Sequence, residues 1–255
     1  MQLKGKTALM TGSCGEGMGR STAFRLAREG ANIVLNHGTH RRGKEVSAAG
    51  GKIADAITEL GGRAIVREAD TRDEQQVEAM VAAADEAFGQ VDILVNNAGG
   101  DWKIRDYTRI PLGDWKAVLA AEIDGPFLLM KHVAGGMRQR RWGRIIHIGM
   151  AGVLWMQGMK GLAPDYCLGK AVRAWMATAF GLGELAHGVT VNCVEPGHVP
   201  HMSFEAALAA ARAEPAAWPK SQGLTCADVA ELVAFLCSEA GRFVTGNTIR
   251  LGRLP

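Results

Sequence analysis

Short β-type runs alternate with longer helical patterns from one end of the chain to the other. Strands that alternate with helices form a parallel sheet covered on both faces, because each helix carries the chain back between two strands. We therefore predict one doubly wound α/β domain over residues 1–255, with ligands bound beyond the carboxyl ends of the strands. The expected strands are 7–11, 32–36, 64–68, 91–96, 144–148, 189–194 and 247–251, and the expected helices are 20–29, 52–60, 74–88, a long one within 115–138, one from Tyr166 to a glycine stop near Gly181, and 228–238.

The composition is that of an ordinary globular protein. Charged residues make up 22% and hydrophobic residues 47% of the 255 residues, and the net charge of +3 is too small to indicate nucleic-acid binding. The five cysteines lack C-x-x-C spacing, which argues against a disulfide framework or a zinc site and for a reducing compartment. The N-terminus lacks the shape of a signal peptide, and there is no apolar run of about 18 residues. We therefore expect a cytoplasmic protein with no membrane span and no metal.

A glycine-rich loop follows the first expected strand and precedes a helix. It reads Thr11-Gly12-Ser13-Cys14-Gly15-Glu16-Gly17-Met18-Gly19. Glycines at such a turn let a pyrophosphate approach the backbone, and the N–H groups at the helix N-terminus favour an anion. The position of the loop indicates a dinucleotide site, although a plain strand-to-helix turn has the same pattern. The candidate contacts are Gly12, Ser13, Gly17, Met18 and Gly19.

The end of the second expected strand bears on which dinucleotide is bound. A dinucleotide site usually carries an acid about 20 residues beyond the glycines, where it bonds the ribose 2′-hydroxyl. Here the segment reads Asn36-His37-Gly38-Thr39-His40-Arg41-Arg42, without a carboxylate. Guanidinium groups in that place suit a 2′-phosphate, so we expect NADP, with His37 and Arg41 as contacts and NAD as the alternative. A solvated basic loop is the other interpretation, and Glu16 in the glycine loop argues against a nearby phosphate.

Tyr166 and Lys170 are four residues apart, so on a helix they share one face. A lysine ammonium beside a phenol favours the phenolate, and it is expected to lower the tyrosine pKa. A tyrosine tuned in this way exchanges a proton near neutral pH. The same spacing also occurs on ordinary surface helices, so the rest of the sequence has to decide between the two interpretations.

Six motifs occur in a fixed order along the chain. They are Thr11-Gly12, Asp70 after the third expected strand, Asn96-Asn97-Ala98-Gly99, Gly143-Arg144-Ile145-Ile146-His147-Ile148, Tyr166-x-x-x-Lys170 and Val191-Asn192-x-Val194-x-Pro196-Gly197. With this set the chain resembles the short-chain dehydrogenase/reductase family over essentially its whole length. The resemblance implies a single Rossmann-type domain with a parallel seven-stranded sheet, a nicotinamide cofactor and, usually, a homotetramer.

The resemblance also places individual residues. It implies that Asp70 lies at the adenine, Asn97 beside the adenosine ribose and Lys170 on the nicotinamide ribose. Val199 would lie at the nicotinamide carboxamide, and Tyr166 would be the proton donor or acceptor. Beyond the glycine loop, the expected cofactor contacts are Asp70, Thr71, Asn97, Ala98, Gly99, Lys170, Pro196, Gly197 and Val199.

Three positions depart from the family pattern. Met150 stands where the family places a catalytic serine, and a thioether cannot donate a hydrogen bond. Glu122 replaces a helix asparagine, and His201 replaces a threonine. Glu122 is a candidate substitute in the proton path near Lys170, and the alternative is a helix carboxylate paired with a lysine.

We therefore expect an NADP(H)-dependent oxidoreductase that transfers a hydride to or from a carbonyl/alcohol pair, or a related C=N or C=C bond, of a small molecule. A cofactor-binding scaffold or redox sensor with vestigial activity is the main alternative, since a fold does not decide a function. Lyase or isomerase chemistry on the same fold ranks last. The catalytic candidates are Tyr166, Lys170 and Glu122, and the substrate candidates are Met150, Trp102, Trp155 and His201, beside a lid around residues 200–222.

Overall fold

The computed structural model describes residues 1–39, 43–153, 162–214 and 223–252. Two of the expected contacts, Arg41 and Trp155, lie outside the described residues, as does Arg42. The part of the expected lid from 215 to 222 lies outside them as well.

The described strands form one sheet of seven parallel strands in the order β3-β2-β1-β4-β5-β6-β7. The order runs outward from the centre in both directions, so it reverses between β1 and β4. In such sheets ligands bind at this reversal, beyond the carboxyl ends of the strands. The strands are β1 (Thr7–Met10), β2 (Asn32–His37), β3 (Ala64–Glu68), β4 (Ile93–Asn96), β5 (Gly143–Ile148), β6 (Val189–Pro196) and β7 (Thr248–Leu251).

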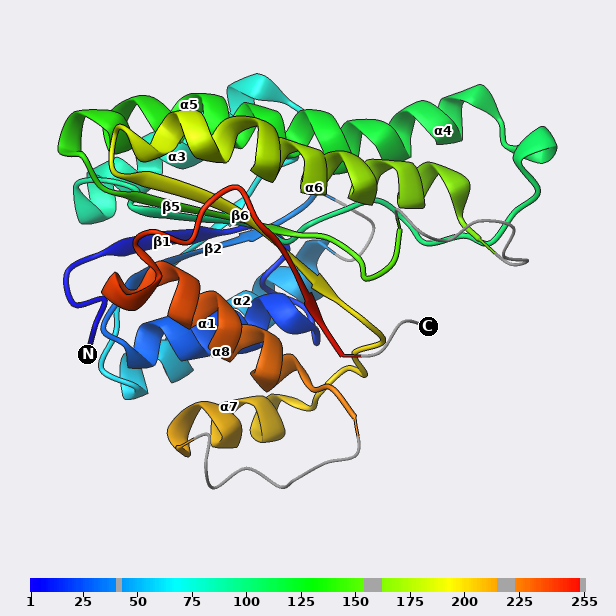
Figure 1. Ribbon diagram of the computed structural model, residues 1–255. Helices are drawn as coiled ribbons and strands as arrows, with labels where there is room; N and C mark the ends of the chain where they lie inside the picture. The colour runs from blue at the N-terminus through cyan, green and yellow to red at the C-terminus, as the bar shows by residue number, and fades with distance from the viewer. Residues whose placement is uncertain (40–42, 154–161, 215–222, 253–255) are drawn as a thin grey trace.

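Helices cover both faces of the sheet (Figure 1). In the figure α1, α2 and α8 lie on one face, and α3, α5 and α6 lie on the other. The predicted doubly wound α/β fold class is therefore confirmed. The helices are α1 (Met18–Arg28), α2 (Gly43–Glu59), α3 (Glu74–Phe88), α4 (Leu112–Leu119), α5 (Gly125–Arg140), α6 (Pro164–Leu185), α7 (Phe204–Arg212) and α8 (Cys226–Cys237), with short turns at Tyr107–Arg109, Ala120–Asp124 and Glu239–Gly241.

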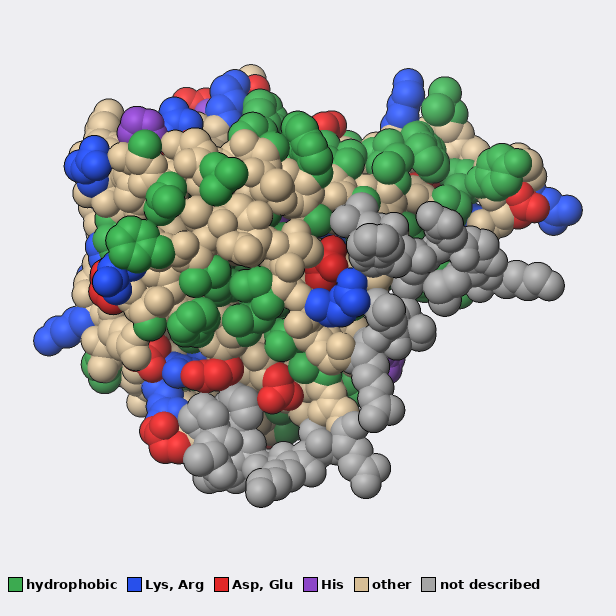
Figure 2. Space-filling view, viewed as in Figure 1, with side chains coloured by type: hydrophobic (Ala, Val, Ile, Leu, Met, Phe, Trp, Pro, Cys, Tyr) green, Lys and Arg blue, Asp and Glu red, His purple; other side chains and the backbone are tan. Residues whose placement is uncertain are grey.

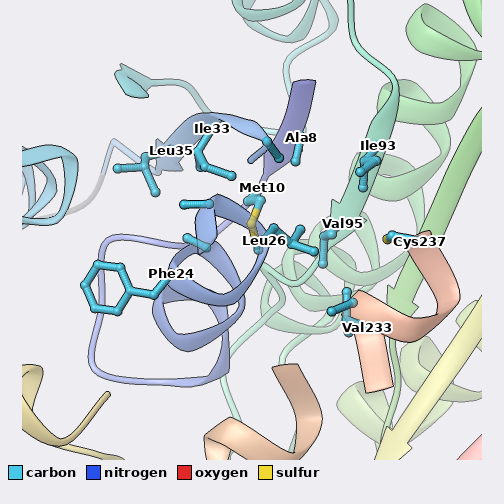
Figure 3. Packing of buried hydrophobic residues seen from close by; sticks show 14 of the residues in the cluster. Ala8, Met10, Phe24, Leu26, Ile33, Leu35, Ile93, Val95, Val233 and Cys237 are labelled. Atoms are coloured by element: carbon cyan, nitrogen blue, oxygen red, sulfur yellow. The ribbon is translucent and has the colours of Figure 1, made fainter. Parts of the chain in front are cut away.

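The central strands are buried on both faces, which is why they are almost continuously apolar. On one face Leu26 of α1 lies close to Met10 of β1, and Val233 and Cys237 of α8 lie close to Val95 of β4 (Figure 3). This packing holds α1 against the sheet, so it also fixes the glycine loop that precedes the helix.

Two helices run further than predicted, and glycines caused both errors. We expected the second helix to begin at residue 52, but α2 begins at Gly43. A Cβ atom on Gly50 would lie 2.9 Å from Val66 Cγ1, so this glycine allows close packing of α2 on β3. We expected the Tyr166 helix to stop near Gly181, but α6 continues to Leu185. A Cβ atom on Gly181 would lie 2.5 Å from the Gly246 nitrogen, so this glycine also serves close packing and does not end the helix.

The long helix expected within 115–138 is interrupted. α4 ends at Leu119, one π-helical turn (Ala120–Asp124) follows, and α5 begins at Gly125. Glu122 lies in this turn, which is a local widening of a helix that often marks a functional site.

Within the described part of the expected lid, one helix packs on the body of the protein. The Phe204 ring at the start of α7 meets the Phe24 ring of α1 edge to face, with 5.6 Å between the centroids. Ala207 and Ala211 of α7 are buried. Among the described residues, no helix is long and apolar enough to cross a membrane, and no cluster of His, Cys, Asp or Glu side chains is suited to hold a metal ion.

Candidate active site

A cleft of about 890 Å³ opens where the sheet order reverses. Its walls come from the loop after β1, the end of β2, the loops after β3 and β4, and helix α4. The parallel sheet therefore brings together residues from motifs that are far apart in the sequence. Six of the expected cofactor contacts line the cleft, namely Gly12, Asp70, Thr71, Asn97, Ala98 and Gly99.

Two glycines of the glycine loop after β1, Gly12 and Gly19, leave no room for a side chain. Gly12 has a φ of +60°, and a Cβ atom there would lie 3.0 Å from the backbone of the loop after β4. A Cβ atom on Gly19 would lie 2.7 Å from Asn97 Nδ2. Gly17 caps α1 and Met18 begins it, so the free N–H groups of the first turn and the positive end of the helix dipole border the loop. This loop has the shape and the donors that a pyrophosphate group needs.

Two polar side chains hold the glycine loop in place. Asn97 Nδ2 donates hydrogen bonds to the carbonyl oxygens of Thr11 and Gly12, at 2.9 and 3.0 Å. Ser13 Oγ accepts a hydrogen bond from the Asn36 N–H at 3.2 Å, which ties the loop to β2. Both side chains thus hold the backbone of the glycine loop in a fixed position.

At the other end of the cleft, Asp70 and Thr71 follow β3. Arg72 Nε donates to Asp70 Oδ1 at 2.9 Å, so the carboxylate that was expected at the adenine is already paired with a guanidinium. His37 is buried at the end of β2, with Nδ1 3.1 Å from the Gly38 carbonyl oxygen. The end of β2 therefore carries an imidazole, not a carboxylate, and the ring is buried while its neighbours Asn36 and Gly38 line the cleft.

Tyr166 and Lys170 lie in the first turns of α6. Lys170 Nζ is 5.0 Å from the centroid of the Tyr166 ring, and it donates a hydrogen bond to the Ile148 carbonyl oxygen at 3.0 Å. The same ammonium lies 3.3 Å from Glu122 Oε2. The indole of Trp102 meets the Tyr166 ring edge to face, with 5.3 Å between the centroids. The structure thus brings together the three catalytic candidates and one of the substrate candidates.

Glu122 is fully buried directly behind the wall of the cleft. Its Oε1 accepts a hydrogen bond from the Gly100 N–H at 2.8 Å, and Gly100 lines the cleft. Side chains at Gly99 or Gly169 would collide with Glu122, so these two glycines make the slot that it occupies. Glu122 is therefore paired with a lysine, as one of the two interpretations expected, and that lysine is Lys170.

The pKa of Tyr166 is raised above its ordinary value, which corrects the lowering expected from the sequence. Burial is the main cause, because it disfavours the phenolate, and the nearby Glu122 carboxylate adds to it. Burial also lowers the pKa of Lys170 to about 8, helped by the positive charge of Arg173. The Lys170 ammonium is thus still mostly protonated at neutral pH.

Arg173 is a site residue that the sequence analysis missed. It is fully buried, and its guanidinium donates hydrogen bonds to the carbonyl oxygens of Asn96 and Ile148, which end β4 and β5. Its Nε lies 2.9 Å from Glu122 Oε2. The signal that was available is a second cation on the helix face that carries the tyrosine and lysine.

Charged residues also extend the cleft along the loop after β4. Arg105 donates to the buried Asp165 carboxylate at 2.9 Å and to Asp114 at 2.6 Å, so it ties this loop to the beginning of α6. No motif in the sequence marked these positions. The charged residues of this part of the cleft are Asp101, Lys103 and Arg105 in the loop and Asp114 in α4.

The remaining expected contacts do not line this cleft. Pro196 ends β6, and the Gly197 N–H donates to the carbonyl oxygen of Leu251, the last residue of β7, at 2.8 Å. Val199 packs partly buried against the core, and His201 is exposed to solvent. Met150 follows β5 and is partly buried.

Comparisons with known proteins agree over almost the whole chain. A family model described as enoyl-(acyl carrier protein) reductase matches residues 13–251. The chain is 32% identical to the (2S)-((R)-hydroxy(phenyl)methyl)succinyl-CoA dehydrogenase subunit BbsD of Thauera aromatica, over 98% of this chain and 96% of that protein. It is also 32% identical to a 3-oxoacyl-(acyl-carrier-protein) reductase of Synechocystis sp., with the same coverage. A blue fluorescent protein from a metagenomic library, solved in complex with NADPH, superposes with a TM-score of 0.81 and 27% identity over 98% of both chains.

Proposed function

The chain belongs to the short-chain dehydrogenase/reductase family, and we propose that it is an NADP(H)-dependent oxidoreductase acting on a small molecule. The hydride is transferred to or from a carbonyl/alcohol pair, or a related C=N or C=C bond. Tyr166 gives or takes the proton, and Lys170 is its electrostatic partner. The observation that carries the proposal is that Lys170 contacts Glu122, and Glu122 accepts a hydrogen bond from Gly100 in the wall of the dinucleotide cleft.

The residues present fit a nicotinamide dinucleotide. The glycine loop would hold the pyrophosphate, Asp70 the adenine, Asn97 the adenosine ribose and Lys170 the nicotinamide ribose. When bound, the nicotinamide supplies or accepts the hydride. The residues of this chain would place the substrate against the Tyr166 hydroxyl and exclude water with apolar side chains such as Trp102. They would also move one proton at the Tyr166 oxygen.

The proposed site lacks one hydrogen-bond donor that would position the substrate. Met150 offers no hydroxyl, and the loss of one positioning donor commonly costs about a hundredfold to a thousandfold in rate. Trp102 adds an apolar wall beside Tyr166. A substrate that carries its own polar group near the reacting carbon is therefore favoured.

Steady-state turnover tests the proposal against the alternative of a scaffold or redox sensor. NADPH consumption is followed with ketones, imines, enones and 3-oxoacyl thioesters, the last because two relatives are named for acyl-carrier-protein or coenzyme A derivatives. An enzyme turns over at least one class with a saturable rate. A chain that binds NADPH but turns over none of them is a scaffold or sensor.

We expect NADPH to bind at least about tenfold more tightly than NADH. The end of β2 has no carboxylate to repel a 2′-phosphate, and a charge-assisted hydrogen bond contributes about 1.5–3 kcal/mol. Arg41→Ala should weaken NADPH binding and leave NADH binding unchanged, whereas His37→Asp should reverse the preference. Fluorescence titration with both nucleotides measures this, with Arg63→Ala, which changes an exposed arginine just before β3, as the control. A clear NADH preference of the parent protein would contradict the prediction.

We also expect a homotetramer built through helix faces. Trp175 and Leu182 on α6 are 64% and 69% exposed, and hydrophobic side chains gather along the side formed by α4, α5 and α6 (Figure 2). Burying such residues between subunits removes apolar surface from water. Light scattering at micromolar concentration measures the mass, and Trp175→Glu should lower it. A parent protein that is a stable monomer would refute the assembly.

A substrate lid at 200–222 is part of the same proposal. Its support is the attachment of the segment before α7 to the glycine loop, since the Met202 N–H donates to the Glu16 carbonyl oxygen at 3.3 Å. Arg20 in the first turn of α1 donates to the Met202 carbonyl oxygen. Movement of the segment before α7 would therefore also shift the glycine loop.

A cytoplasmic location completes the proposal. All five cysteines are free thiols, and four of them are buried. Free buried thiols suit a reducing compartment.

A further inference from the structure

Arg173 lies about one turn beyond Lys170 on α6 and has no exposed surface. Its guanidinium donates to main-chain carbonyl oxygens from three parts of the chain, namely the end of β4 with the loop after it, the end of β5 and the π-helical turn. Its Nε also lies 2.9 Å from the Glu122 carboxylate. A cation held by this many bonds has a fixed position, so its charge acts from a defined place.

Three buried charges meet beside Tyr166. Lys170 and Arg173 both contact Glu122 Oε2, at 3.3 and 2.9 Å. At neutral pH, where Lys170 is still mostly protonated, two cations and one carboxylate leave one net positive charge, whereas Lys170 and Glu122 alone would leave none. In a water-excluded place such a difference acts strongly on a neighbouring phenol.

We propose that Arg173 is a positioning residue of the active site, which holds the Glu122 carboxylate beside Lys170 and offsets its negative charge at Tyr166. The proposal rests on the proposed function, in which Tyr166 moves the proton. It explains how a site with a buried carboxylate next to its lysine keeps an excess of positive charge for the phenolate. In agreement with it, Glu122 acts to raise the pKa of Tyr166 and Arg173 acts to lower it.

The other titratable groups around these residues do not replace Arg173. Burial lowers the pKa of His147 to about 3 and raises that of Cys193 to about 12, so both are neutral at neutral pH. Burial raises the pKa of the Cys167 thiol as well. The carboxylate of Asp165 is paired with Arg105, and Glu195 of β6, whose pKa burial also raises, is the register partner of Arg250 on the neighbouring strand β7.

The test measures the ionisation of Tyr166 without turnover. The chain has two tyrosines, so Tyr107→Phe leaves Tyr166 as the single one. With tyrosine labelled at the ring carbon that bears the hydroxyl, carbon-13 NMR follows its titration with pH. The variants in this background are Glu122→Gln, Glu122→Gln with Arg173→Met, and Glu122→Gln with Arg173→Lys.

Glu122→Gln should lower the pH at which Tyr166 ionises by about one unit, because the carboxylate no longer opposes the phenolate and the Arg173 charge alone remains beside it at that pH. Adding Arg173→Met should raise this pH again by about one unit, and adding Arg173→Lys should leave it near the Glu122→Gln value, because the charge is kept. Arg138→Met, which removes another arginine that pairs with a glutamate between α5 and α6, is the control and should have no effect.

Equal shifts in the Met and Lys variants, or no shift in either, would overturn the proposal, since the role of Arg173 would then be structural only. Circular dichroism checks that each variant folds. If neither Arg173 variant folds, Glu122→Gln decides alone, and an unchanged Tyr166 titration there would reject the charge balance.

The pH dependence of kcat/KM in the oxidation direction separates this proposal from the proposed function. If both hold, the rising limb moves with the NMR titration in every variant. NMR shifts without any turnover would leave the role of Arg173 standing and remove the oxidoreductase. Turnover that requires Tyr166 but is unchanged by Arg173→Met would leave the oxidoreductase standing and remove the proposed role of Arg173.

Discussion

Tyr166→Phe should lower turnover by about two to four orders of magnitude and leave cofactor affinity nearly unchanged. The phenylalanine ring keeps the edge-to-face contact with Trp102 and the place beside Lys170. Only the hydroxyl is lost, and with it the proton that the reaction needs. The raised pKa of Tyr166 keeps the hydroxyl protonated in the free protein, so the group is ready to donate.

Steady-state kinetics on one accepted substrate, together with nucleotide titration, measures both quantities. Tyr107→Phe is the matched control, because Tyr107 is the other tyrosine and is 76% exposed in a short turn before α4. It should behave as the parent protein does. Retained activity in Tyr166→Phe would mean that another group moves the proton and would reject the mechanism proposed here.

The fold could be predicted from local patterns because a parallel sheet imposes them. Its strands are buried on both faces, so they read as short apolar runs, and each crossover needs a helix of its own. The errors occurred where one residue has two uses. Gly50 and Gly181 look like helix ends, yet both lie inside helices at points of close approach to β3 and to Gly246. Only the tertiary structure distinguishes a glycine that ends a helix from one that lets it pack closely.

The candidate site could be predicted only where its residues belong to motifs. The loops after β1, β3 and β4 meet at the reversal of the sheet order, so residues of these motifs line one cleft. The direction of the Tyr166 pKa could not be predicted, because it depends on burial and on Glu122, which comes from a different helix. The slot for Glu122 depends in turn on Gly99 and Gly169, which are far apart in the sequence.

The burial of Arg173 could not be predicted from the sequence either. An arginine within a helix usually lies on the surface, since a buried cation needs partners for its charge and its donors. Here the partners are carbonyl oxygens at the ends of two strands and in the π-helical turn, and none of these is near it in sequence. The residue is buried because the fold supplies these acceptors.

Lys170→Met should lower turnover at least about a hundredfold and also weaken cofactor binding, because the ammonium serves both Tyr166 and the nicotinamide ribose in the proposed site. The variant should still fold. Methionine is close to lysine in length, and the Ile148 carbonyl oxygen keeps a donor, since Arg173 Nη1 also bonds it at 3.1 Å. Kinetics and nucleotide titration measure the losses, with Lys131→Met, an exposed lysine paired with Glu74 on the surface, as the control.

The same substitution changes how stability depends on pH, which gives a measurement that needs no substrate. The pKa of Lys170 is about 8 in the folded chain and 10.5 ordinarily. Between these values the unfolded chain binds the proton and the folded chain does not, so the stability of the parent protein should rise with pH, by at most about 1.4 kcal/mol per pH unit from this group. Lys170→Met should lack this rise in chemical unfolding experiments between pH 8 and 10. If parent and variant gain stability equally over that range, Lys170 is not the buried ammonium described here, and its role beside Tyr166 would have to be abandoned.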